Sequence, residues 1–470
     1  MKFLFDIING INGILYDPVL IILLLAIGLY FTLGTGFIQI RYFREALRVV
    51  MERPSSEKEV SSFQALMVST ASRVGTGNIV GVSSALCLGG YGAIFWMWLV
   101  AIIGGASAFV ESTLAQIYKR RDGDGGSYGG PAYYIESALK SRKLGVVFAV
   151  SLVLTYAVGF NMLAAYNLTS SFTSYEFYRP EVTPWIIGGI LALVTAYCLF
   201  GGGKRILAFT STLVPIMGII FVLVSVLMII RNIGYMPTVF RLIFQDAFNF
   251  QAIFGGMAGS SLMYGIKRGL YSNEAGIGSA PNAAAAASVS HPAKQGLVQM
   301  LSVAIDTLLI CSATAFMCLS SGIAPDPALD GAPYVQEALS TFLGPWGHPF
   351  VTLSLSLFAF TTLIGNLYYV ENNLTYIRGK KLTKGATAVY QILAVVVIFL
   401  GAAQEAAYAW AVADLLMGVM ALINLPAILA LQKHALAALR HYSAQRKEGR
   451  DPQFSSRDIG LAQGSLDYWG

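Results

Sequence analysis

A run of ten residues within an otherwise apolar stretch, 69–78, carries a dense set of polar side chains. It reads Ser-Thr-Ala-Ser-Arg-Val-Gly-Thr-Gly-Asn and contains four hydroxyls, one arginine, one amide and two glycines. Such groups are costly at bilayer depth unless they line a protein cavity. A broken helix there offers free N–H groups for a carboxylate and free carbonyls for a small cation. The run therefore predicts a site for a zwitterion and a sodium ion.

A second interruption, 255–261, reads Gly-Gly-Met-Ala-Gly-Ser-Ser and follows about 180 residues later. Small residues such as Gly255 and Gly259 also occur where helices pack closely, but packing does not need Arg73 or Asn78 at bilayer depth. Paired broken helices in corresponding positions indicate a secondary transporter with an inverted repeat and a binding site near the middle of the membrane.

Several further polar residues fall in apolar stretches or at their edges. Arg73 requires a counter-charge, for which Asp306 is the first candidate, and both a structural pair and a gating or coupling role stay open. Thr361 and Thr362 offer adjacent hydroxyls, which become candidate cation ligands if they lie next to the carbonyls of the broken span. The remaining acidic residues of this kind are Glu111, Glu371, Glu405 and Asp414.

The amino-acid composition indicates the class of protein that carries these polar residues. Only 12% of the 470 residues are charged, 56% are hydrophobic, and the mean hydropathy is +0.63. These values indicate an integral membrane protein. The net charge of +6 does not indicate nucleic-acid binding, because the basic residues are distributed between spans. The four cysteines show no metal-ligand or disulfide spacing.

We expect an all-α integral membrane protein with about eleven transmembrane helices. The N-terminal segment 1–17 precedes a transporter domain over 18–431, and 432–470 form a polar tail. Within the transporter domain, an opening span over 18–36 precedes a first repeat over about 63–230, a second over about 250–403 and a final span over 405–431. The expected spans are 18–36, 63–89, 92–118, 144–172, 183–201, 207–230, 250–266, 295–321, 348–376, 386–403 and 405–431.

Basic residues alternate between the connections, which sets the expected orientation. One set of connections holds 26 Lys and Arg residues, including Lys267 and Arg268, whereas the opposite set holds only Lys2, Arg179, Arg231 and Arg241. Basic connections stay cytoplasmic. We therefore expect the N-terminus outside the cell, the C-terminus inside, and an exposed cytoplasmic tail.

Four segments of the sequence resemble the alanine/glycine:cation symporters, also called the sodium:alanine symporter family. The resemblance covers nearly the whole chain and implies that the last ten helices form the five-plus-five inverted repeat of the neurotransmitter:sodium symporter-like fold. The segments that carry it are 73–82 (RVGTGNIVGV), 92–98 (GAIFWMW), 272–281 (SNEAGIGSAP) and 291–296 (HPAKQG), with Lys204-Arg205-Ile206 and Leu213-Val214-Pro215 in the same order.

This resemblance implies roles for particular residues. The family's sodium site would use the carbonyls of Ala71 and Val74 with the hydroxyls of Thr361 and Thr362. Its substrate carboxylate would lie at Thr76, Gly77 and Asn78, and small residues would form the other wall of the substrate site. Asn273 and Glu274 would follow the seventh span in a cytoplasmic segment. The residues of the other wall are Gly255, Gly256 and Gly259.

Two positions depart from the family pattern. A glutamine expected in the fourth span is Ala164, and a tryptophan expected after the glycine of the ninth span is Asn366. Both changes remove side-chain volume from the expected substrate pocket. They favour a larger or more polar amino acid, such as glutamine, beside alanine and glycine.

The resemblance and the broken spans together predict sodium-coupled symport of a small neutral amino acid, without an organic cofactor. The expected partners are the amino acid, sodium and the lipid bilayer, in a prokaryotic cytoplasmic (inner) membrane, and the oligomeric state stays open. An intramembrane enzyme is less well supported, because the four histidines lie at or beyond the span ends. A channel is also less well supported, because an ion filter is built from identical elements.

Overall fold

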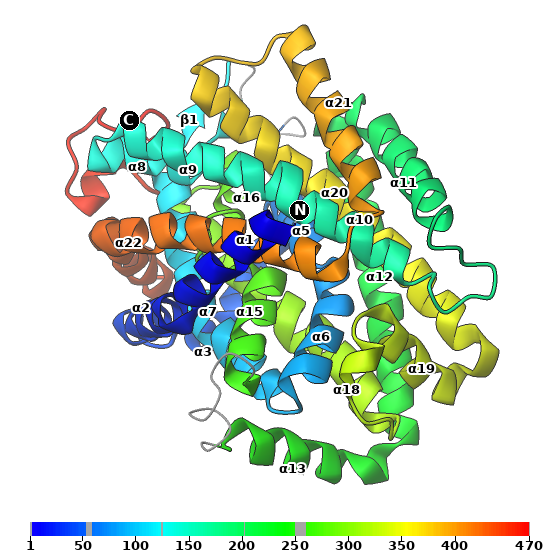
Figure 1. The fold of residues 1–470 in the computed structure, drawn as a ribbon. Coiled ribbons are helices and arrows are strands. Elements are labelled where there is room, and N and C mark those ends of the chain that lie inside the picture. Colours follow the sequence, from blue (N-terminus) through cyan, green and yellow to red (C-terminus); the bar gives the residue numbers. More distant parts are fainter. Residues whose placement is uncertain (1, 53–58, 124–125, 202, 250–259, 470) are drawn as a thin grey trace.

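The computed structural model describes residues 2–52, 59–123, 126–201, 203–249 and 260–469, without the side chains of 17, 18 and 203–207. The chain folds into a bundle of helices with one two-stranded antiparallel sheet (Figure 1). In that sheet Arg120 pairs with Tyr128 and Arg121 with Ser127.

The elements fall into an opening segment and two halves. The opening segment holds α1 (Lys2–Ile14), the π-helical turn η1 (Leu15–Leu20), α2 (Ile21–Gly34), α3 (Ile38–Arg41) and α4 (Phe43–Val50). The first half holds α5 (Ser62–Arg73), η2 (Thr76–Asn78), α6 (Val80–Gly89), α7 (Ala93–Ile117), β1 (Arg120–Arg121), β2 (Ser127–Tyr128), α8 (Pro131–Leu139), α9 (Arg142–Leu154), η3 (Thr155–Phe160), α10 (Asn161–Ser170), α11 (Thr183–Leu199) and α12 (Gly203–Arg231). The second half holds η4 (Ile233–Tyr235), α13 (Met236–Ala247), α15 (Ser261–Asn273), α16 (Pro281–Ala286), α17 (Pro292–Val303), η6 (Ala304–Cys311), α18 (Ser312–Ser320), η7 (Pro327–Leu329), α19 (Ala332–Leu343), η8 (Gly344–Trp346), α20 (Gly347–Arg378), α21 (Lys384–Gly401), α22 (Ala406–Lys447) and η9 (Ser456–Ile459).

Seven helical stretches of the described residues are long and apolar enough to cross a bilayer: 93–117, 142–170, 208–231, 292–320, 332–378, 384–401 and 406–447. Shorter apolar helices cover 21–34, 76–89 and 183–199. Residues 208–231 form the most apolar of these stretches. Only 28% of the residues in its most apolar 18-residue segment are buried, so this helix presents apolar side chains outward. An apolar outer surface is stable in lipid. The protein is therefore a helical membrane protein, and the count of eleven spans stays a prediction.

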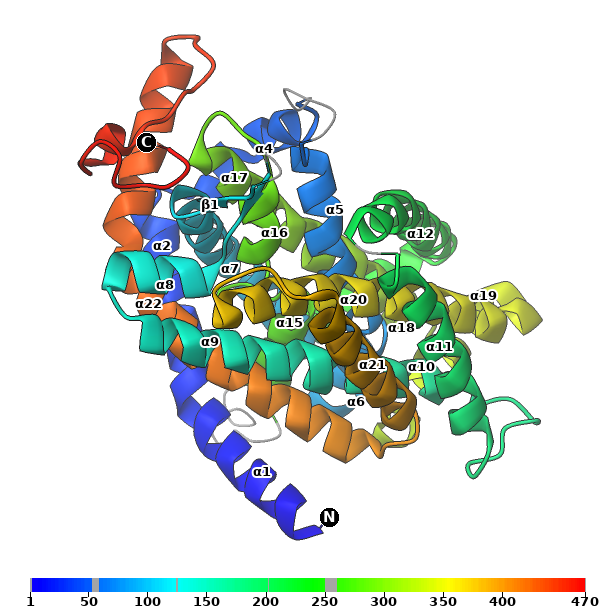
Figure 2. The same ribbon diagram turned by 90° about the horizontal axis from the view of Figure 1, so that it is seen from above.

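Two interrupted helices lie at the centre of the bundle (Figures 1 and 2). The first consists of α5 and α6, and the second of α15 and α16. The first half of one packs against the second half of the other, because α15 contacts α6 and α16 contacts α5. Two broken helices that run in opposite directions are the arrangement expected of an inverted repeat.

The first interruption has a local cause. Ser61 begins α5 with a capping box, in which its hydroxyl accepts from Gln64 N and the Gln64 side chain accepts from Ser61 N. At the other end, the Asn78 side chain accepts the Gly75 N–H at 2.7 Å, so this N–H is not donated to the carbonyl one turn earlier. A side chain that takes a backbone donor ends a helix. The predicted break within 69–78 is present at Val74–Ile79.

The second interruption lies at Glu274–Ala280, between α15 and α16. The predicted interruption over 255–261 falls mostly outside the described residues, and Ser261 already belongs to α15. Glu274 caps α15 with a left-handed φ of 52°, and Gly276 and Gly278 follow at 85° and 91°. Positive φ angles suit glycine because it lacks a Cβ atom.

This position of the break overturns an expectation about Asn273 and Glu274. They do not lie in a cytoplasmic segment after a span, because both are buried at the end of α15, with Glu274 only 1% exposed. The charge count changes for the same reason. Lys267 and Arg268 lie within α15, in contact with Tyr16 and Asp414, so they do not belong to a basic connection.

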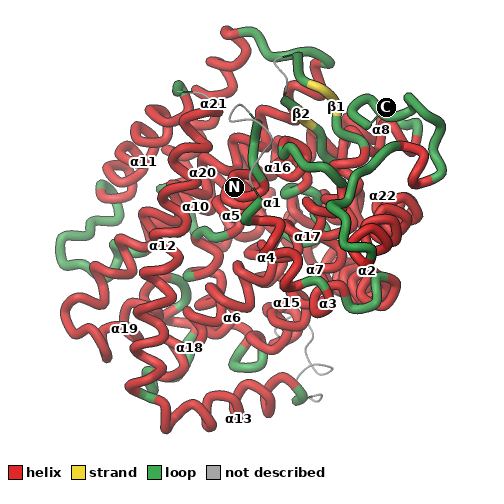
Figure 3. The backbone as a smooth tube through the Cα atoms, turned by 180° about the vertical axis from the view of Figure 1, so that it is seen from behind, coloured by secondary structure: helices red, strands yellow, loops and turns green. Residues whose placement is uncertain are grey.

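The C-terminal segment also differs from the expected exposed tail. Helix α22 continues to Lys447, and the chain then folds back along α8 and the β1–β2 hairpin (Figure 3). Trp469 is only 9% exposed and donates from Nε1 to the Gln116 carbonyl at 2.7 Å. Lys119 Nζ lies 3.7 Å from the centre of the Tyr468 ring. The polar composition of this segment suggested full exposure, but a few aromatic side chains near its end attach it to the helix bundle.

Candidate functional site

The end of α5 presents a corner of oxygen atoms. Among the described residues, no hydrogen bond is directed to the carbonyls of Ala71, Ser72, Arg73 or Val74. The buried hydroxyl of Thr362 on α20 likewise has no partner. It points at this corner, because a Cβ atom added to Gly75 would collide with Thr362 Oγ1. Free carbonyls and an unbonded hydroxyl are suitable ligands for a hard cation.

Thr361 has a different environment from Thr362. Its hydroxyl donates to the carbonyls of Leu357 and Phe358 in its own helix, both at 3.1 Å. A hydroxyl bonded in this way mainly satisfies helix carbonyls. The structure thus brings Ala71, Val74 and Thr362 together at one corner, whereas Thr361 is bonded within α20.

The residues predicted to receive a carboxylate form the short turn after the break. Among the described residues, no backbone carbonyl accepts a hydrogen bond from the N–H groups of Thr76 and Gly77. Gly77 has room only for hydrogen, because an added Cβ atom would lie 2.8 Å from Tyr271 Cε1 on α15. The Thr76 hydroxyl accepts from Asn167 Nδ2 of α10 at 3.0 Å. These free N–H groups precede α6, where the helix dipole favours a negative charge.

The two departures from the family pattern lie near the same turn. Asn366 of α20 accepts from the Ser72 hydroxyl at 2.8 Å and donates to Asn161 Oδ1 of α10 at 3.0 Å. Ala164 is buried in α10 midway between Asn161 and Asn167, three residues from each. Residues three apart share a helix face, so Ala164 lies on the face that contacts the broken helix and α20.

Glu274 also lies at this site, although the sequence analysis gave it no role in binding. Its carboxylate accepts from Ser72 at 3.0 Å and from Ser279 at 2.6 Å, and so connects the two interrupted helices. The Ser72 hydroxyl lies within hydrogen-bond distance of both Glu274 and Asn366, and its single hydrogen is donated to one of them at a time. A signal was present, since Ser72 falls in the polar run and Glu274 in a family segment, but only the fold places them in contact.

Arg73 and Asp306 do not form a direct ion pair. Arg73 Nη1 donates to the backbone carbonyl and the side-chain Oε1 of Gln299, both at 3.3 Å. Asp306 accepts instead from Asn78 and two hydroxyls. The proposed wall residues Gly255, Gly256 and Gly259 lie outside the described residues.

One side of the site is closed by a buried ion pair between the second broken helix and α22. Arg268 Nη1 lies 3.4 Å from Asp414 Oδ1, and the Arg268 guanidinium lies 3.6 Å from the centre of the Trp410 ring. Trp410 packs edge to face against Tyr271 with ring centres 5.0 Å apart. Because Tyr271 lies against Gly77, this stack separates the turn from a cavity of about 430 Å³ that Lys267, Arg268 and Asp414 line.

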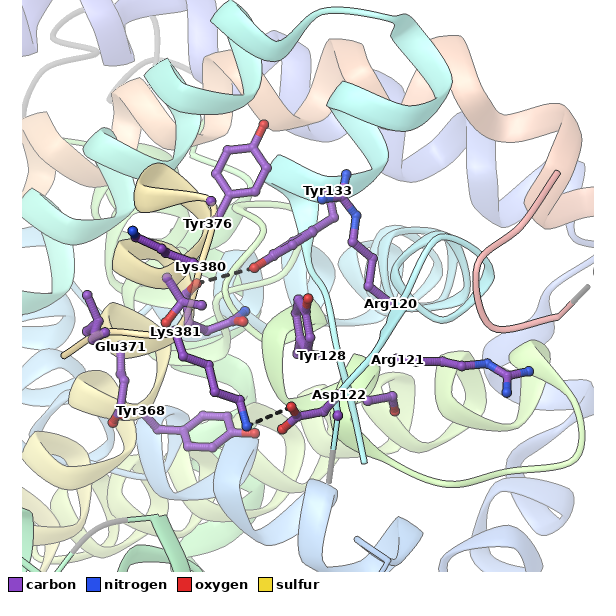
Figure 4. Close-up of a pocket in the computed structure, with 16 residues that line it drawn as sticks. Arg120, Arg121, Asp122, Tyr128, Tyr133, Tyr368, Glu371, Tyr376, Lys380 and Lys381 are labelled. Atoms are coloured by element: carbon purple, nitrogen blue, oxygen red, sulfur yellow. Dashed lines mark hydrogen bonds and ion pairs between the residues drawn. The ribbon is translucent and has the colours of Figure 1, made fainter. Parts of the chain in front are cut away.

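A cavity of about 620 Å³ lies between the β1–β2 hairpin, α8 and the C-terminal part of α20. Figure 4 shows its aromatic and charged lining, in which Lys381 Nζ and Asp122 Oδ1 are 2.7 Å apart. It begins at Tyr368, two residues beyond Asn366 on α20. The side chain of Asn372 in its wall also donates to Asn282 of α16 at 2.6 Å. The two cavities thus lie at opposite ends of the broken helices.

The chemistry of this site is that of binding. Among the described residues no group of three or more His, Cys, Asp or Glu side chains is placed to hold a metal ion. The oxygen atoms at the break are carbonyls and hydroxyls, which suit sodium better than a transition metal.

The full-length sequence comparisons agree with this geometry. The model of the sodium:alanine symporter family matches residues 1–456. "Amino-acid carrier protein AlsT" of Bacillus subtilis is 44% identical over 93% of this chain and 92% of its own. "Probable sodium/glutamine symporter GlnT" of the same organism is 42% identical over 100% and 97%. "Sodium/alanine symporter AgcS" of Methanococcus maripaludis is 37% identical over 94% and 98%.

Solved structures share the fold at low sequence identity. A Na⁺-coupled sialic acid symporter in its substrate-bound outward-open state aligns with a TM-score of 0.52, 13% identity and 93% coverage of each chain. The Eremococcus coleocola manganese transporter aligns with a TM-score of 0.51 and 11% identity, over 83% of this chain and 81% of its own. The protein thus has the neurotransmitter:sodium symporter-like fold. With its break, its oxygen-rich corner and its full-length relatives in agreement, the chain belongs to the sodium:alanine symporter family.

Proposed function

We propose that this protein moves a small neutral amino acid into the cell together with sodium, by alternating access. The observation that carries the proposal is the first helix break, which presents two kinds of unused backbone group. On one side of the break, unbonded carbonyls lie near the Thr362 hydroxyl. On the other side, the unbonded N–H groups of Thr76 and Gly77 lie just before the following half-helix. One break can therefore hold a cation and a carboxylate at once.

The proposed sodium ligands are the carbonyls of Ala71 and Val74 and the hydroxyl of Thr362. Thr361, the preceding residue on α20, bonds to the carbonyls of its own helix and is not among the proposed ligands. The carboxylate of the amino acid would bind at Thr76 and Gly77, with Asn78 holding the turn. The helix dipole favours a negative charge there, and the missing side chain of Gly77 lets the ligand approach the backbone.

A polar neutral substrate such as glutamine fits the site in addition to alanine and glycine. The buried Asn161 Nδ2 atom has no partner among the described residues, although its Oδ1 atom accepts from Asn366. Beside this pair lies Ala164, whose side chain is smaller than the glutamine of the family pattern. A site with an unused buried donor favours a substrate with a side-chain acceptor.

The proposed orientation has the N-terminus outside and the C-terminus inside a prokaryotic cytoplasmic membrane. The basic residues of the connections and of the C-terminal segment support it, even after Lys267 and Arg268 are assigned to α15. The 430 Å³ cavity would then face outward and the 620 Å³ cavity inward. The Arg268–Asp414 pair would close the outer path in this conformation.

The test uses purified protein in liposomes with sodium imposed outside and potassium inside. Labelled alanine and labelled glutamine are each expected to accumulate above the external concentration, and the accumulation is expected to stop when potassium replaces sodium. Inhibition constants for alanine, glycine, serine and glutamine then rank the substrates, and Ala164→Gln is expected to weaken glutamine relative to alanine. Equilibration without accumulation would refute symport and indicate a channel.

A further inference from the structure

The chain changes direction where α2 ends and then forms two short helices, α3 and α4. Two consecutive residues, Gly36 and Phe37, have left-handed φ angles of 65° and 58°. Phe37 N donates to the Thr32 carbonyl at 2.8 Å, which closes the end of α2. Helix α3 begins directly after Phe37, and α4 follows Tyr42. The turn therefore ends α2, which is an apolar helix, and starts α3 and α4 in a new direction.

One side of α3 and α4 is docked on the helix bundle. Ile38, Ala46 and Val49 on this side are fully buried. Helix α4 packs against α17, which follows the second broken helix (Figure 2). Glu52, just beyond α4, accepts from Lys294 Nζ of α17 at 2.9 Å. These contacts hold α4 in one orientation and so fix what its other side faces.

The side of α3 and α4 that points away from the bundle is apolar. Its side chains are spaced three or four residues apart, which places them on one helical face. All of them are exposed, Ile40 at 75% and Met51 at 76%. The residues of this face are Ile40, Phe43, Leu47 and Met51. Exposed apolar side chains continue the face along α2 at Leu29, Leu33 and Phe37. An apolar face that continues from a membrane helix is stable against lipid.

Arginines border this apolar face. Arg41 and Arg44 are exposed, and Arg44 lies three residues before Leu47, so its side chain emerges beside the face. Among the described residues, neither arginine forms an ion pair with a carboxylate. The acidic residue nearest in sequence, Glu45, contacts Arg48 at 2.8 Å. The edge of the face therefore carries positive charge that no protein group balances, the pattern of a helix that binds anionic lipid.

We propose that α4 lies in the membrane interface and selects anionic phospholipids. Arg41 and Arg44 contact the headgroup phosphates, whose charge is unbalanced in an anionic lipid, and the apolar face contacts the acyl chains. A second copy of this chain fits the face less well, because a two-fold contact brings the same arginines of both copies together. The bound lipid holds α4 against the start of α17 and is separate from the proposed transport site.

The experiment measures which lipid touches α4. Full-length protein with Met51→Cys is labelled with a fluorescent maleimide, which reports on α4 because the four native cysteines are buried. The protein is reconstituted in liposomes of phosphatidylcholine and phosphatidylglycerol, with bromine atoms on the acyl chains of one lipid or the other. Bromine quenches a label that it contacts. Both lipids are expected to quench, and phosphatidylglycerol is expected to do so at a several-fold lower mole fraction.

Charge variants in the same background test the arginines. One arginine near an anionic surface contributes a preference of about fivefold, so Arg44→Gln is expected to lower the preference for phosphatidylglycerol by about that factor. Arg44→Lys keeps the charge and is expected to keep the preference. Arg179→Gln, at an exposed position between α10 and α11, is the matched control and is expected to leave it unchanged. Raising the salt concentration is expected to weaken the preference, because salt screens surface charges.

Three results would overturn the proposal, and none of them requires a variant that transports. Absence of quenching by either lipid would place the apolar face outside the bilayer. Energy transfer between labels on separate copies, in place of quenching, would assign the face to a contact between two copies. Equal quenching by the two lipids, or a preference that survives Arg41→Gln combined with Arg44→Gln, would show that α4 does not select anionic lipid.

Discussion

Two adjacent threonines on α20 show that residue type alone does not decide which side chain contributes to a site. Thr361 and Thr362 are the same residue type, one position apart, and both are buried. Successive positions on a helix point about 100° apart, so only one of them faces the break. The hydroxyl of Thr362 is unbonded at the Gly75 turn, whereas that of Thr361 bonds to its own helix.

This difference predicts unequal effects of the same substitution. Thr362→Val removes the proposed cation ligand without changing side-chain volume and is expected to raise the half-saturating sodium concentration about tenfold or more. Thr361→Val is the matched control and is expected to raise it less than about twofold. Sodium titrations of labelled uptake measure both. Equal shifts in the two variants would show that α20 presents a different face to the cation.

Two glycines of the first broken helix allow a similar comparison. A Cβ atom at Gly77 would lie 2.8 Å from Tyr271 Cε1, whereas one at Gly81 has its nearest neighbours at 3.9 Å. Gly77→Ala is therefore expected to abolish uptake, because the methyl group displaces Tyr271 and crowds the backbone proposed to bind the substrate carboxylate. Gly81→Ala is expected to transport nearly as wild type. Uptake assays with expression matched by immunoblot decide it, and active Gly77→Ala would refute the carboxylate site.

At the scale of elements, α15 and α22 contact each other beside the Gly77 turn, and this contact is the proposed gate of the site. The Arg268–Asp414 pair and the Trp410–Tyr271 stack join the two helices over the Gly77 turn. Both side chains of the ion pair are only 6% exposed. Removing one partner leaves a buried charge without its counter-charge, which destabilises the closed arrangement relative to an open one.

Asp414→Asn is accordingly expected to shift the population toward opening at this end. A cysteine introduced at Gly81, which is buried against the Tyr271–Trp410 stack, reports on the change, since the four native cysteines are buried. Labelling by a membrane-impermeant maleimide is expected to rise several-fold with Asp414→Asn in this background. Glu181→Gln is the charge control and is expected to leave labelling unchanged. Unchanged labelling with Asp414→Asn would rule out a gating role for the pair.

At the scale of the whole molecule, the C-terminal segment stabilises a helix end close to the site. Trp469 bonds to Gln116, and Lys119 contacts the Tyr468 ring. Gln116 and Lys119 in turn donate to the Ala287 carbonyl, each at 2.9 Å, immediately after the second half of the broken helix. The C-terminal segment thus supports α16 through the end of α7.

Trp469→Ala is expected to destabilise the protein by about 1–3 kcal/mol, because it removes a buried ring and the hydrogen bond to Gln116. The midpoint of thermal unfolding in detergent, followed by intrinsic fluorescence, is expected to fall. Trp346→Ala removes the same ring from a position that is 74% exposed and is expected to leave the midpoint unchanged. Equal midpoints for Trp469→Ala and wild type would mean that the C-terminal segment does not stabilise the end of α7.

Sequence reasoning predicted the membrane class, the family and the first break. Long apolar stretches can be inferred locally, because crossing lipid demands about 20 consecutive helical residues. The break at Val74–Ile79 was also predicted locally, because Asn78 acts on Gly75 only three residues away. Glycine, hydroxyl and amide groups concentrated in one span indicate a protein-lined cavity in any fold, because they are not stable against lipid.

The break at Glu274–Ala280 was not predicted from the sequence. The predicted interruption over 255–261 falls mostly outside the described residues, whereas the break at Glu274–Ala280 is held by partners from distant helices. Gly276 N donates to Glu111 of α7, and the Glu274 carboxylate accepts from Ser72 of α5. Interactions between residues 165 and 202 positions apart leave no periodic signal in the sequence.

The partners of the buried charges were likewise decided by the tertiary structure. The sequence showed that Arg73 and Asp306 are too polar for the bilayer and must be satisfied inside the protein. It did not show that Arg73 contacts Gln299 while Asp306 contacts Asn78, since both choices depend on how α5, α17 and η6 pack. Composition and spacing determine which groups need partners. Only the packing of helices that are remote in sequence determines which partner each group receives.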